Sequence, residues 1–316
     1  MRISILSPFF APSVGGAAKY YSILVDLIKE DFEQIELITE SHPKKKYGNE
    51  LIPEKNLLIR RLIPYKSGRP NTDIIKYLSF AVQELLIILL PFIISKKSKA
   101  LVIHSHFIQN SYALPMMLGI CKLLFKHIKL VADIRDTGLC ASRIDLLKEF
   151  NEVIVCSKNA YENIKKRQNN LNITYIPVPF RLEKVESSDA RNILKKLEVD
   201  QGEYIFTPNG IDEKKAFSKI YQLFKLLKVK RPKLKLVVAG RYKSKKSTYN
   251  ESLRNGEMIH FKELDSKKIL SLMMFSKLIV VMPNSIEGMP RTILEGISVG
   301  ARIMYPFNIY ELEGEE

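Results

Sequence analysis

The stretch KLIVVMPNSIEGMPRTILEGISVGARIMYP, residues 277–306, contains a strand, a loop, a helix and a second strand in succession. After Lys277, residues 278–283 form a continuous apolar run that ends in proline, which is typical of a strand buried on both faces. Pro290 suits the first turn of a helix, and residues 302–306 return to a short strand pattern. This order of elements is typical of a parallel sheet covered by helices.

The same alternation runs through the chain. Strand patterns occur at residues 2–6, 34–39, 100–106, 129–136, 152–157, 173–178, 204–208, 234–240 and 258–261, with longer helical stretches between them. The sequence therefore predicts an α/β fold of the doubly wound type. A proline pair, Pro177 and Pro179, precedes a charged stretch without apolar alternation, which places a boundary near Phe180. Two domains are predicted, 1–180 and 181–316, and the second lacks a closing helix, so it is predicted to be incomplete.

The composition limits the function. Fifty Lys and Arg against 34 Asp and Glu give a net charge of +16, which favours an anionic partner unless the lysines are only solvated surface. The widely spaced Cys121, Cys140 and Cys156 indicate buried thiols in a reducing compartment, without metal or disulfide spacing. The longest apolar run, residues 85–94, is half of what a spanning helix needs. It predicts a core helix or a membrane-surface helix, with the first interpretation favoured.

The first domain offers candidate residues after three strands. Gly15 and Gly16 precede a helix, where backbone amides can approach a phosphate, although a simple tight turn explains them equally well. His104 and His106 are predicted to share one face of a strand end; a zinc pair would lack a third ligand, so a single hydrogen-bonding histidine is favoured. Arg135 is predicted either to be held by two carboxylates, Asp133 and Asp136, or to touch a substrate together with Asp136.

The second domain carries basic residues at strand ends, namely Lys214, Lys215 and Arg241, each of which could also be ordinary solvated surface. Glu287 lies before a helix, and Glu295 is predicted two turns into it, so a shared ligand would be roughly 11 Å long. A nucleotide sugar fits this length, with its hexose at the first carboxylate, its diphosphate at the helix N-terminus and its ribose at the second. The alternative is that neither glutamate binds a ligand, so that Glu287 is only an acidic residue at the helix N-terminus and Glu295 an exposed residue of the helix.

Residues 277–306 resemble the donor-site signature of the retaining GT-B glycosyltransferases of family 4: a strand, P-S-x-x-E-G, a helix with a second Glu, then A-x-G-x-P-V. The segments SILSPFFAPSVGGAAKYY, ALVIHSHF, EVIVCSKNAYENI and LKLVVAGRY are similar to other passages of that family, in the same order. The resemblance covers nearly the whole chain. It implies a GT-B fold with two Rossmann-like domains facing a cleft.

The resemblance also implies roles for the candidate residues. Donor sugar and phosphate would contact Glu287 and the amides around Gly288, Met289 and Arg291, while Glu295 would hold the ribose. Gly15, Gly16, Lys214 and Arg241 would bind the diphosphate, Glu287, His106 and Lys215 would serve catalysis, and Arg135 and Asp136 would face the acceptor. Three departures stand out: Gly210 replaces an expected arginine, Asn284 a serine, and Arg302 a proline.

The predicted function is that of a retaining transferase that moves a hexose or N-acetylhexosamine from a nucleoside diphosphate sugar to a glycan or lipid-linked acceptor in surface polysaccharide synthesis. No metal or cofactor is expected. The expected location is cytoplasmic, with peripheral contact to an anionic membrane face. Two alternatives stay open: a truncated or degenerate transferase without activity, and a basic nucleic-acid-binding protein, which lacks a recognition motif.

Overall fold

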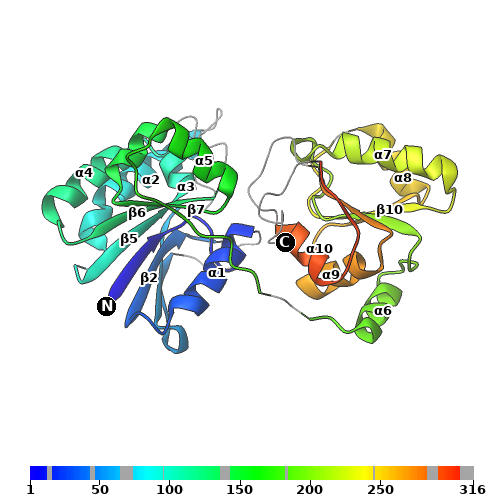
Figure 1. The fold of residues 1–316 in the computed structure, drawn as a ribbon, viewed down its shortest axis with the longest axis horizontal. Helices are drawn as coiled ribbons and strands as arrows, with labels where there is room; N and C mark the ends of the chain where they lie inside the picture. The colour runs from blue at the N-terminus through cyan, green and yellow to red at the C-terminus, as the bar shows by residue number, and fades with distance from the viewer. Residues whose placement is uncertain are drawn as a thin grey trace. The chain divides into compact units, whose positions relative to one another are not determined.

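The computed structural model describes residues 1–12, 16–42, 47–64, 74–94, 96–135, 143–181, 184–244, 246–282 and 291–306. For Gly16, residues 74–76 and Lys214 only the backbone is described. The chain divides into two compact units, Met1–Pro179 and Phe180–Glu316, each with its own sheet (Figure 1). The division falls one residue before the boundary drawn from the sequence.

The described strands of the first unit form an eight-stranded sheet. Their spatial order is β3 (Gly48–Ile52), β4 (Leu57–Ile63), β2 (Gln34–Glu40), β1 (Arg2–Leu6), β5 (Ser98–His104), β6 (Lys129–Ile134), β7 (Glu152–Val155) and β8 (Ile173–Tyr175). Only the β3–β4 pair is antiparallel among these neighbours. The strand order reverses at β1, and ligands bind at such reversal points in open α/β sheets.

Helices cover both faces of this sheet because every central strand is apolar on both sides (Figure 1). One face packs against α1 (Gly16–Ile28) through Tyr21 and Val25. The other face packs against α2 (Ile74–Ile93), α3 (Ser105–Asn110), α4 (Leu114–Leu124) and α5 (Lys158–Arg167). Short 3-10 turns, η1 (Pro53–Lys55) and η3 (Ile144–Glu149), complete the described part of the unit.

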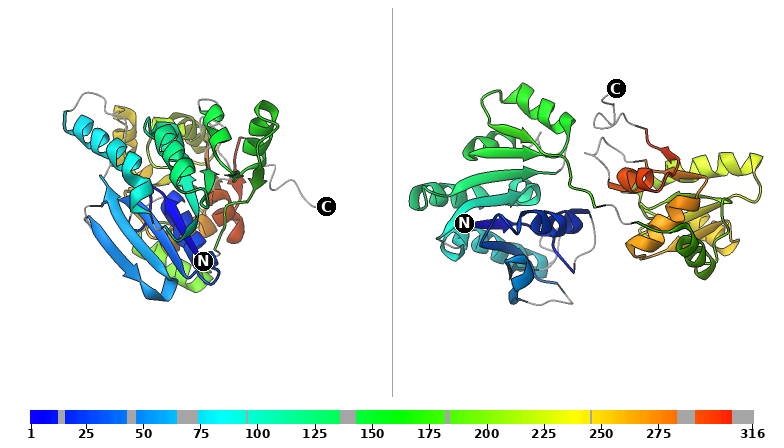
Figure 2. Two further views of the ribbon diagram at one scale, coloured as in Figure 1. Left: turned by 90° about the vertical axis from the view of Figure 1, so that its left-hand side faces the viewer. Right: turned by 60° about the horizontal axis from the view of Figure 1, so that its bottom comes forward.

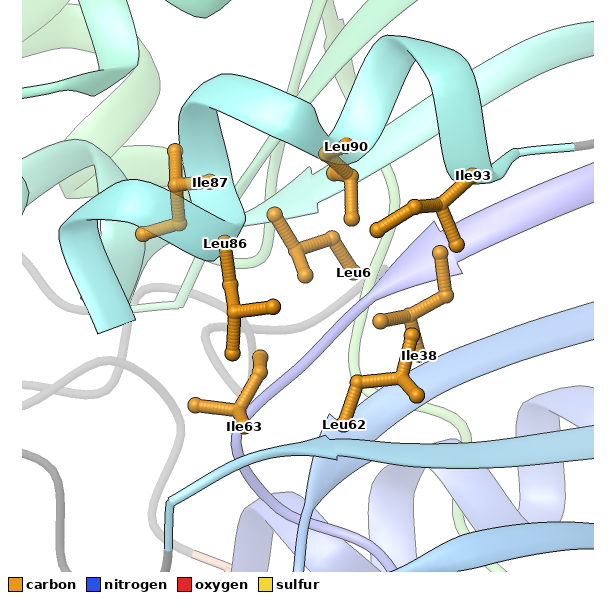
Figure 3. Close-up of a pocket in the computed structure, with 8 residues that line it drawn as sticks. All are labelled: Leu6, Ile38, Leu62, Ile63, Leu86, Ile87, Leu90 and Ile93. Atoms are coloured by element: carbon orange, nitrogen blue, oxygen red, sulfur yellow. The ribbon is translucent and has the colours of Figure 1, made fainter. Parts of the chain in front are cut away.

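The inner face of α2 packs on aliphatic side chains of the sheet. Figure 3 shows Leu86, Ile87, Leu90 and Ile93 of α2 above side chains from β1, β2 and β4. The gap between them is about 10 Å³ and has an aliphatic lining, so it is too small and too apolar to hold an ordered water. Close packing here fixes α2 firmly on the sheet.

The described residues of the second unit form a five-stranded sheet, parallel at every described pair. Its order is β11 (Met258–Phe261), β10 (Lys235–Ala239), β9 (Tyr204–Thr207), β12 (Leu278–Val280) and β13 (Ile303–Met304). One face carries α7 (Phe217–Lys230), after the turn η4 (Glu213–Lys215), and α8 (Ser247–Arg254). The other carries α6 (Ser187–Lys196), α9 (Ser266–Phe275) and α10 (Arg291–Ser298) (Figure 1).

Three elements differ from the sequence-based expectation. The strands β3 and β4 were not predicted, and β3 makes the first sheet mixed rather than purely parallel. The charged stretch after Phe180 contains the helix α6, which buries Ala190 and Leu194 four residues apart and packs on α9. Two apolar positions are enough for a short helix on an existing core, although they give only a weak periodic signal.

Candidate functional site

The carboxyl ends of β5 and β6 hold a buried polar cluster in the first unit. Asp133, at the end of β6, is 1% exposed and accepts a hydrogen bond from Tyr21 Oη at 2.7 Å. Its other carboxylate oxygen lies 2.6 Å from Arg135 Nη2. Since Tyr21 comes from α1 and Asp133 from β6, their hydrogen bond ties the helix to the end of this strand.

Arg135 is held on two sides. Its guanidinium carbon lies 3.7 Å from the centre of the Tyr20 ring, and Nη2 also donates to Tyr20 Oη. Burial alone would lower the pKa of Arg135, but the Asp133 carboxylate and Tyr20 raise it above its usual value. The guanidinium is therefore permanently charged, and its Nε and Nη1 atoms have no hydrogen-bond partner within the described part of the chain. The structure thus buries a cation whose two remaining N–H groups make no hydrogen bond to the described residues.

The two histidines do not share a strand face as predicted. The strand β5 ends at His104, and His106 lies in the first turn of α3. The reason is local, since Nδ1 of His104 accepts a hydrogen bond from the backbone N–H of His106 at 2.9 Å and caps the new helix. No group of three or more potential metal ligands occurs among the described residues.

His104 and His106 are both held neutral. Burial lowers the pKa of His104 to about 3 and also lowers the pKa of His106. Because Nδ1 of neutral His104 accepts the capping bond, its proton lies on Nε2, which has no partner among the described residues. His104 thus supplies a buried N–H donor next to Arg135. His106 bonds through Nδ1 to the Asn110 amide at 3.3 Å, and its Nε2 is likewise unpartnered in the described structure.

We expect His104 to make the first unit acid-sensitive. Unfolded histidine titrates near pH 6.5, whereas folded His104 binds a proton only at about pH 3. Between these values the unfolded chain binds more protons, so the free energy of unfolding falls as the pH falls, by up to about 1.4 kcal/mol per pH unit. Among the described residues, the charged or titratable groups around the ring include His106, Arg135 and Tyr21, and Asp133 is the residue that pairs with His104 on β6.

Urea unfolding followed by circular dichroism from pH 7 to pH 4 measures this effect. His104→Asn keeps a side-chain acceptor for the N-cap and removes the titrating ring, so its stability is expected to depend less steeply on pH. His127→Asn, at an exposed histidine, is the control and is expected to follow the wild type. Parallel curves for wild type and His104→Asn would show that His104 is not the group responsible.

In the second unit, two glycines bring the ends of β9 and β10 into direct backbone contact. Gly210 has a φ of +70° and Gly240 a φ of +122°, conformations that favour glycine. Gly210 N–H donates to Ala239 O at 2.9 Å, and Ile211 N–H donates to Arg241 O at 2.9 Å. A Cβ at position 210 would lie 2.5 Å from Arg241 O. The backbone therefore leaves no room for the arginine expected at this position.

The basic residues beside this contact are placed differently from one another. Arg241 follows β10 and is exposed, while Lys215 ends η4, where its N–H donates to Asp212 O at 2.9 Å. The Lys214 side chain lies outside the described structure. Thr207, missed by the sequence analysis, is fully buried at the end of β9, and its hydroxyl has no partner within the described residues.

Glu295 lies on α10, the helix that the sequence predicts to carry it. The described residues of this helix are Arg291–Ser298, and the residues before Arg291, on which the predicted helix start depends, lie outside the described structure. Glu295 Oε1 lies 3.0 Å from Arg291 Nε, and the Glu295 side chain is 19% exposed. A ligand hydroxyl that binds Glu295 would therefore bind a carboxylate already oriented by an arginine.

Five predicted site residues lie outside the described residues: Gly15, Asp136, Glu287, Gly288 and Met289. For Gly16 only the backbone, the first residue of α1, is described. Tyr20 and Tyr21 join the candidate set from the structure, and His104, a candidate already in the sequence, is found beside them. Their signal in the sequence was a tyrosine pair at the start of the first helix and a histidine at a strand end, which does not show that they meet.

Comparison with known proteins agrees with this architecture. Residues 189–303 match the family model described as glycosyl transferases group 1. No curated protein matches the chain.

Solved structures with a similar fold include sucrose-phosphate synthase from Thermosynechococcus elongatus, with 14% identity, a TM-score of 0.68 and coverage of 96% of this chain and 80% of that one. The Anabaena protein HepE in complex with UDP-glucose has 15% identity, a TM-score of 0.66 and the same two coverages, 96% and 80%. The catalytic domain of starch synthase IV from Arabidopsis thaliana, bound to ADP and acarbose, has 10% identity, a TM-score of 0.66 and coverages of 96% and 82%.

With two Rossmann-like units built on parallel sheets and solved glycosyltransferase structures that align over nearly all of it, this chain has the GT-B fold, and its second unit carries the match to the group 1 glycosyltransferases.

Proposed function

We propose that this protein is a glycosyltransferase that moves a hexose or N-acetylhexosamine from a nucleoside diphosphate sugar to an acceptor hydroxyl. The match of residues 189–303 to the group 1 glycosyltransferases carries the proposal. It is supported by similar structures that hold UDP-glucose or ADP. We further propose transfer with retention, as in family 4, and an acceptor that is a glycan or a lipid-linked sugar in surface polysaccharide synthesis at the cytoplasmic side of a membrane.

The second unit is proposed to bind the donor. Glu295, oriented by Arg291, accepts hydrogen bonds from the ribose hydroxyls, and Lys215 and Arg241 stand at strand ends that can face the diphosphate. As the sugar leaves, negative charge builds up on the phosphate, and nearby cations stabilise it without a bound metal. Glu287, Gly288 and Met289 keep their predicted roles at the sugar.

The first unit is proposed to bind the acceptor. Its donors are Arg135 Nε and Nη1 and the Nε2–H of His104, all unpartnered within the described residues. Neutral His106 can orient the attacking hydroxyl, because burial lowers its pKa and leaves its ring uncharged at neutral pH. Such a set of donors suits an acceptor rich in hydroxyl or phosphate oxygens.

Saturation-transfer NMR with UDP-, GDP- and ADP-sugars tests donor binding. Glu295→Gln removes the charged acceptor, worth about 1.5–3 kcal/mol when it is bonded, and is expected to weaken the best donor by about 10- to 100-fold. Arg291→Gln breaks the same ion pair but keeps both the carboxylate and the backbone amide, so it is expected to weaken binding less. Glu263→Gln, at an exposed glutamate, is the control.

A degenerate transferase remains the second candidate, because Gly210 leaves no space for the expected arginine. Release of nucleoside diphosphate from the bound donor, measured with and without membrane extract as acceptor source, separates the two. An active enzyme releases it faster with acceptor. Binding without release supports the degenerate transferase, and failure of all three donor types to bind would contradict both.

A further inference from the structure

The helix α2 carries large apolar side chains on its exposed face as well as on its buried face, which is unusual for a helix on the outside of a domain. Its inner face buries Ile87 and Leu90 at the sheet, and Ile94, directly after the helix, is buried with them. Its outer face exposes a stripe of large apolar side chains spaced by four and three residues: Leu78 63%, Val82 48%, Leu85 55%, Leu89 42% and Phe92 62%. Figure 2 shows α2, in cyan, along the outside of the first unit.

The neighbouring helix α4 extends this apolar surface. Met116, Leu123 and Leu124 are each at least half exposed on it. The middle of α2 is bound to the segment just before α4, because Glu84 Oε2 accepts hydrogen bonds from Ser111 Oγ at 2.9 Å and from Ala113 N–H at 2.6 Å. A ring contact between Phe80 and Tyr112, 6.2 Å between centroids, adds to these bonds. These contacts hold the two helices together as one rigid apolar surface. We call it the α2–α4 face, and its exposed apolar residues are Leu78, Val82, Leu85, Leu89, Phe92, Met116, Leu123 and Leu124.

Lysines border this face at one end. The helix α2 leads into β5 and the helix α4 leads into β6, so both helices end near the amino ends of these strands. There Ala100 of β5 pairs with Lys129 of β6. The two loops are joined by a hydrogen bond between His127 Nε2 and Lys96 O at 2.9 Å. Five lysines at this edge are exposed: Lys96, Lys97, Lys99, Lys126 and Lys129. The nearby carboxylates Glu149 and Glu33 form ion pairs with Lys122 and the N-terminal amine, and Glu33 also feels the charge of Lys97. With five exposed lysines, the edge is positive.

We propose that the α2–α4 face is a docking surface for an anionic lipid bilayer, with the apolar stripe in the headgroup–acyl boundary and the lysine edge on acidic headgroups. An apolar face bordered by lysines is the pattern of helices that lie in the membrane interface, and each lysine near an anionic surface adds to the attraction. No described helix is long and apolar enough to cross the bilayer, so the contact is peripheral. The inference concerns a surface outside the candidate transfer site and does not depend on the proposed activity.

Co-sedimentation with vesicles of phosphatidylcholine and phosphatidylglycerol at 7:3, compared with pure phosphatidylcholine, tests the proposal. The wild type is expected to partition at least tenfold more strongly onto the anionic vesicles at 0.1 M salt. The triple variant Leu78→Glu, Leu85→Glu, Phe92→Glu is expected to lose at least tenfold in partition coefficient. Its matched control is Leu226→Glu with Val229→Glu, at two exposed apolar residues of α7, which is expected to bind like the wild type.

The lysine edge is tested separately. Lys96→Gln, Lys99→Gln and Lys126→Gln together are expected to lower binding to the anionic vesicles three- to tenfold, whereas Lys262→Gln with Lys267→Gln, two exposed lysines of the second unit, is expected to change it little. Circular dichroism checks that each variant folds. The proposal fails if the wild type does not bind the anionic vesicles, if the α2 variant binds them equally well, or if light scattering shows that this face instead joins two copies of the chain.

Discussion

Replacement of Arg135 by methionine is expected to destabilise the first unit by about 3–5 kcal/mol. The reason is the buried carboxylate of Asp133, which is 1% exposed and would lose its ion pair with Arg135 at 2.6 Å, while keeping the Tyr21 hydrogen bond. Removing one partner of a buried pair leaves the other charge without compensation, which costs far more than the pair itself contributes. The stacking of Arg135 on Tyr20 is lost as well.

Hydrogen exchange of peptides from β5 and β6 measures this loss in the first unit separately from the second. Lys122→Met is the control, because it breaks an ion pair with Glu149 in which both side chains are almost half exposed, and such pairs contribute at most about 1 kcal/mol. The double variant Asp133→Asn, Arg135→Met is expected to recover part of the stability, since no charge is then buried unpaired. Equal protection in Arg135→Met and Lys122→Met would rule out Asp133 and Arg135 as the buried pair that secures the strand ends.

The sequence predicted the parallel strands well where burial on both faces leaves a continuous apolar run. It failed at β4, whose middle residues are Arg60 and Arg61. These are acceptable in a buried strand because Glu36 of the neighbouring β2 lies 2.6 Å from Arg60, and the carbonyl of Ala11 accepts from Arg61 at 2.5 Å. The partners lie far away in the sequence, so no local pattern reveals that these charges are satisfied.

The candidate site follows the same rule. The sequence predicts histidines at the end of one strand, and an arginine and an aspartate at the end of another. Open α/β sheets bind ligands at such strand ends. That Tyr21 bonds Asp133 across 112 positions of chain cannot be read from the sequence. The end of β5 at His104 cannot be read from the sequence either. The strand pattern continues through His106, whereas in the structure the His104 ring caps a helix that begins at Ser105.

Replacement of Gly210 by alanine is expected to have the second large effect, on the donor unit. The new Cβ would lie 2.5 Å from Arg241 O and 2.8 Å from Arg241 N, both backbone atoms that cannot rotate away. Relief requires the ends of β9 and β10 to separate, which breaks the bonds from Gly210 N–H to Ala239 O and from Ile211 N–H to Arg241 O. We expect a loss of about 1–3 kcal/mol beyond the cost of the positive φ, and donor affinity at least tenfold lower, since Lys215 and Arg241 follow these strand ends.

Gly202→Ala is the matched control, since Gly202 has the same φ of +70° and a Cβ added there would meet nothing within 4 Å among the described residues. It isolates the cost of the left-handed backbone, about 1 kcal/mol. Exchange protection of β9 and β10, together with titration calorimetry of the donor, measures both variants. Gly210→Arg, which would restore the residue of the family signature, meets the same obstruction at its Cβ and is expected to lose donor affinity rather than gain it. If Gly210→Arg instead tightens donor binding, the contact between the two strand ends is not rigid, and the arginine was lost without a structural cause.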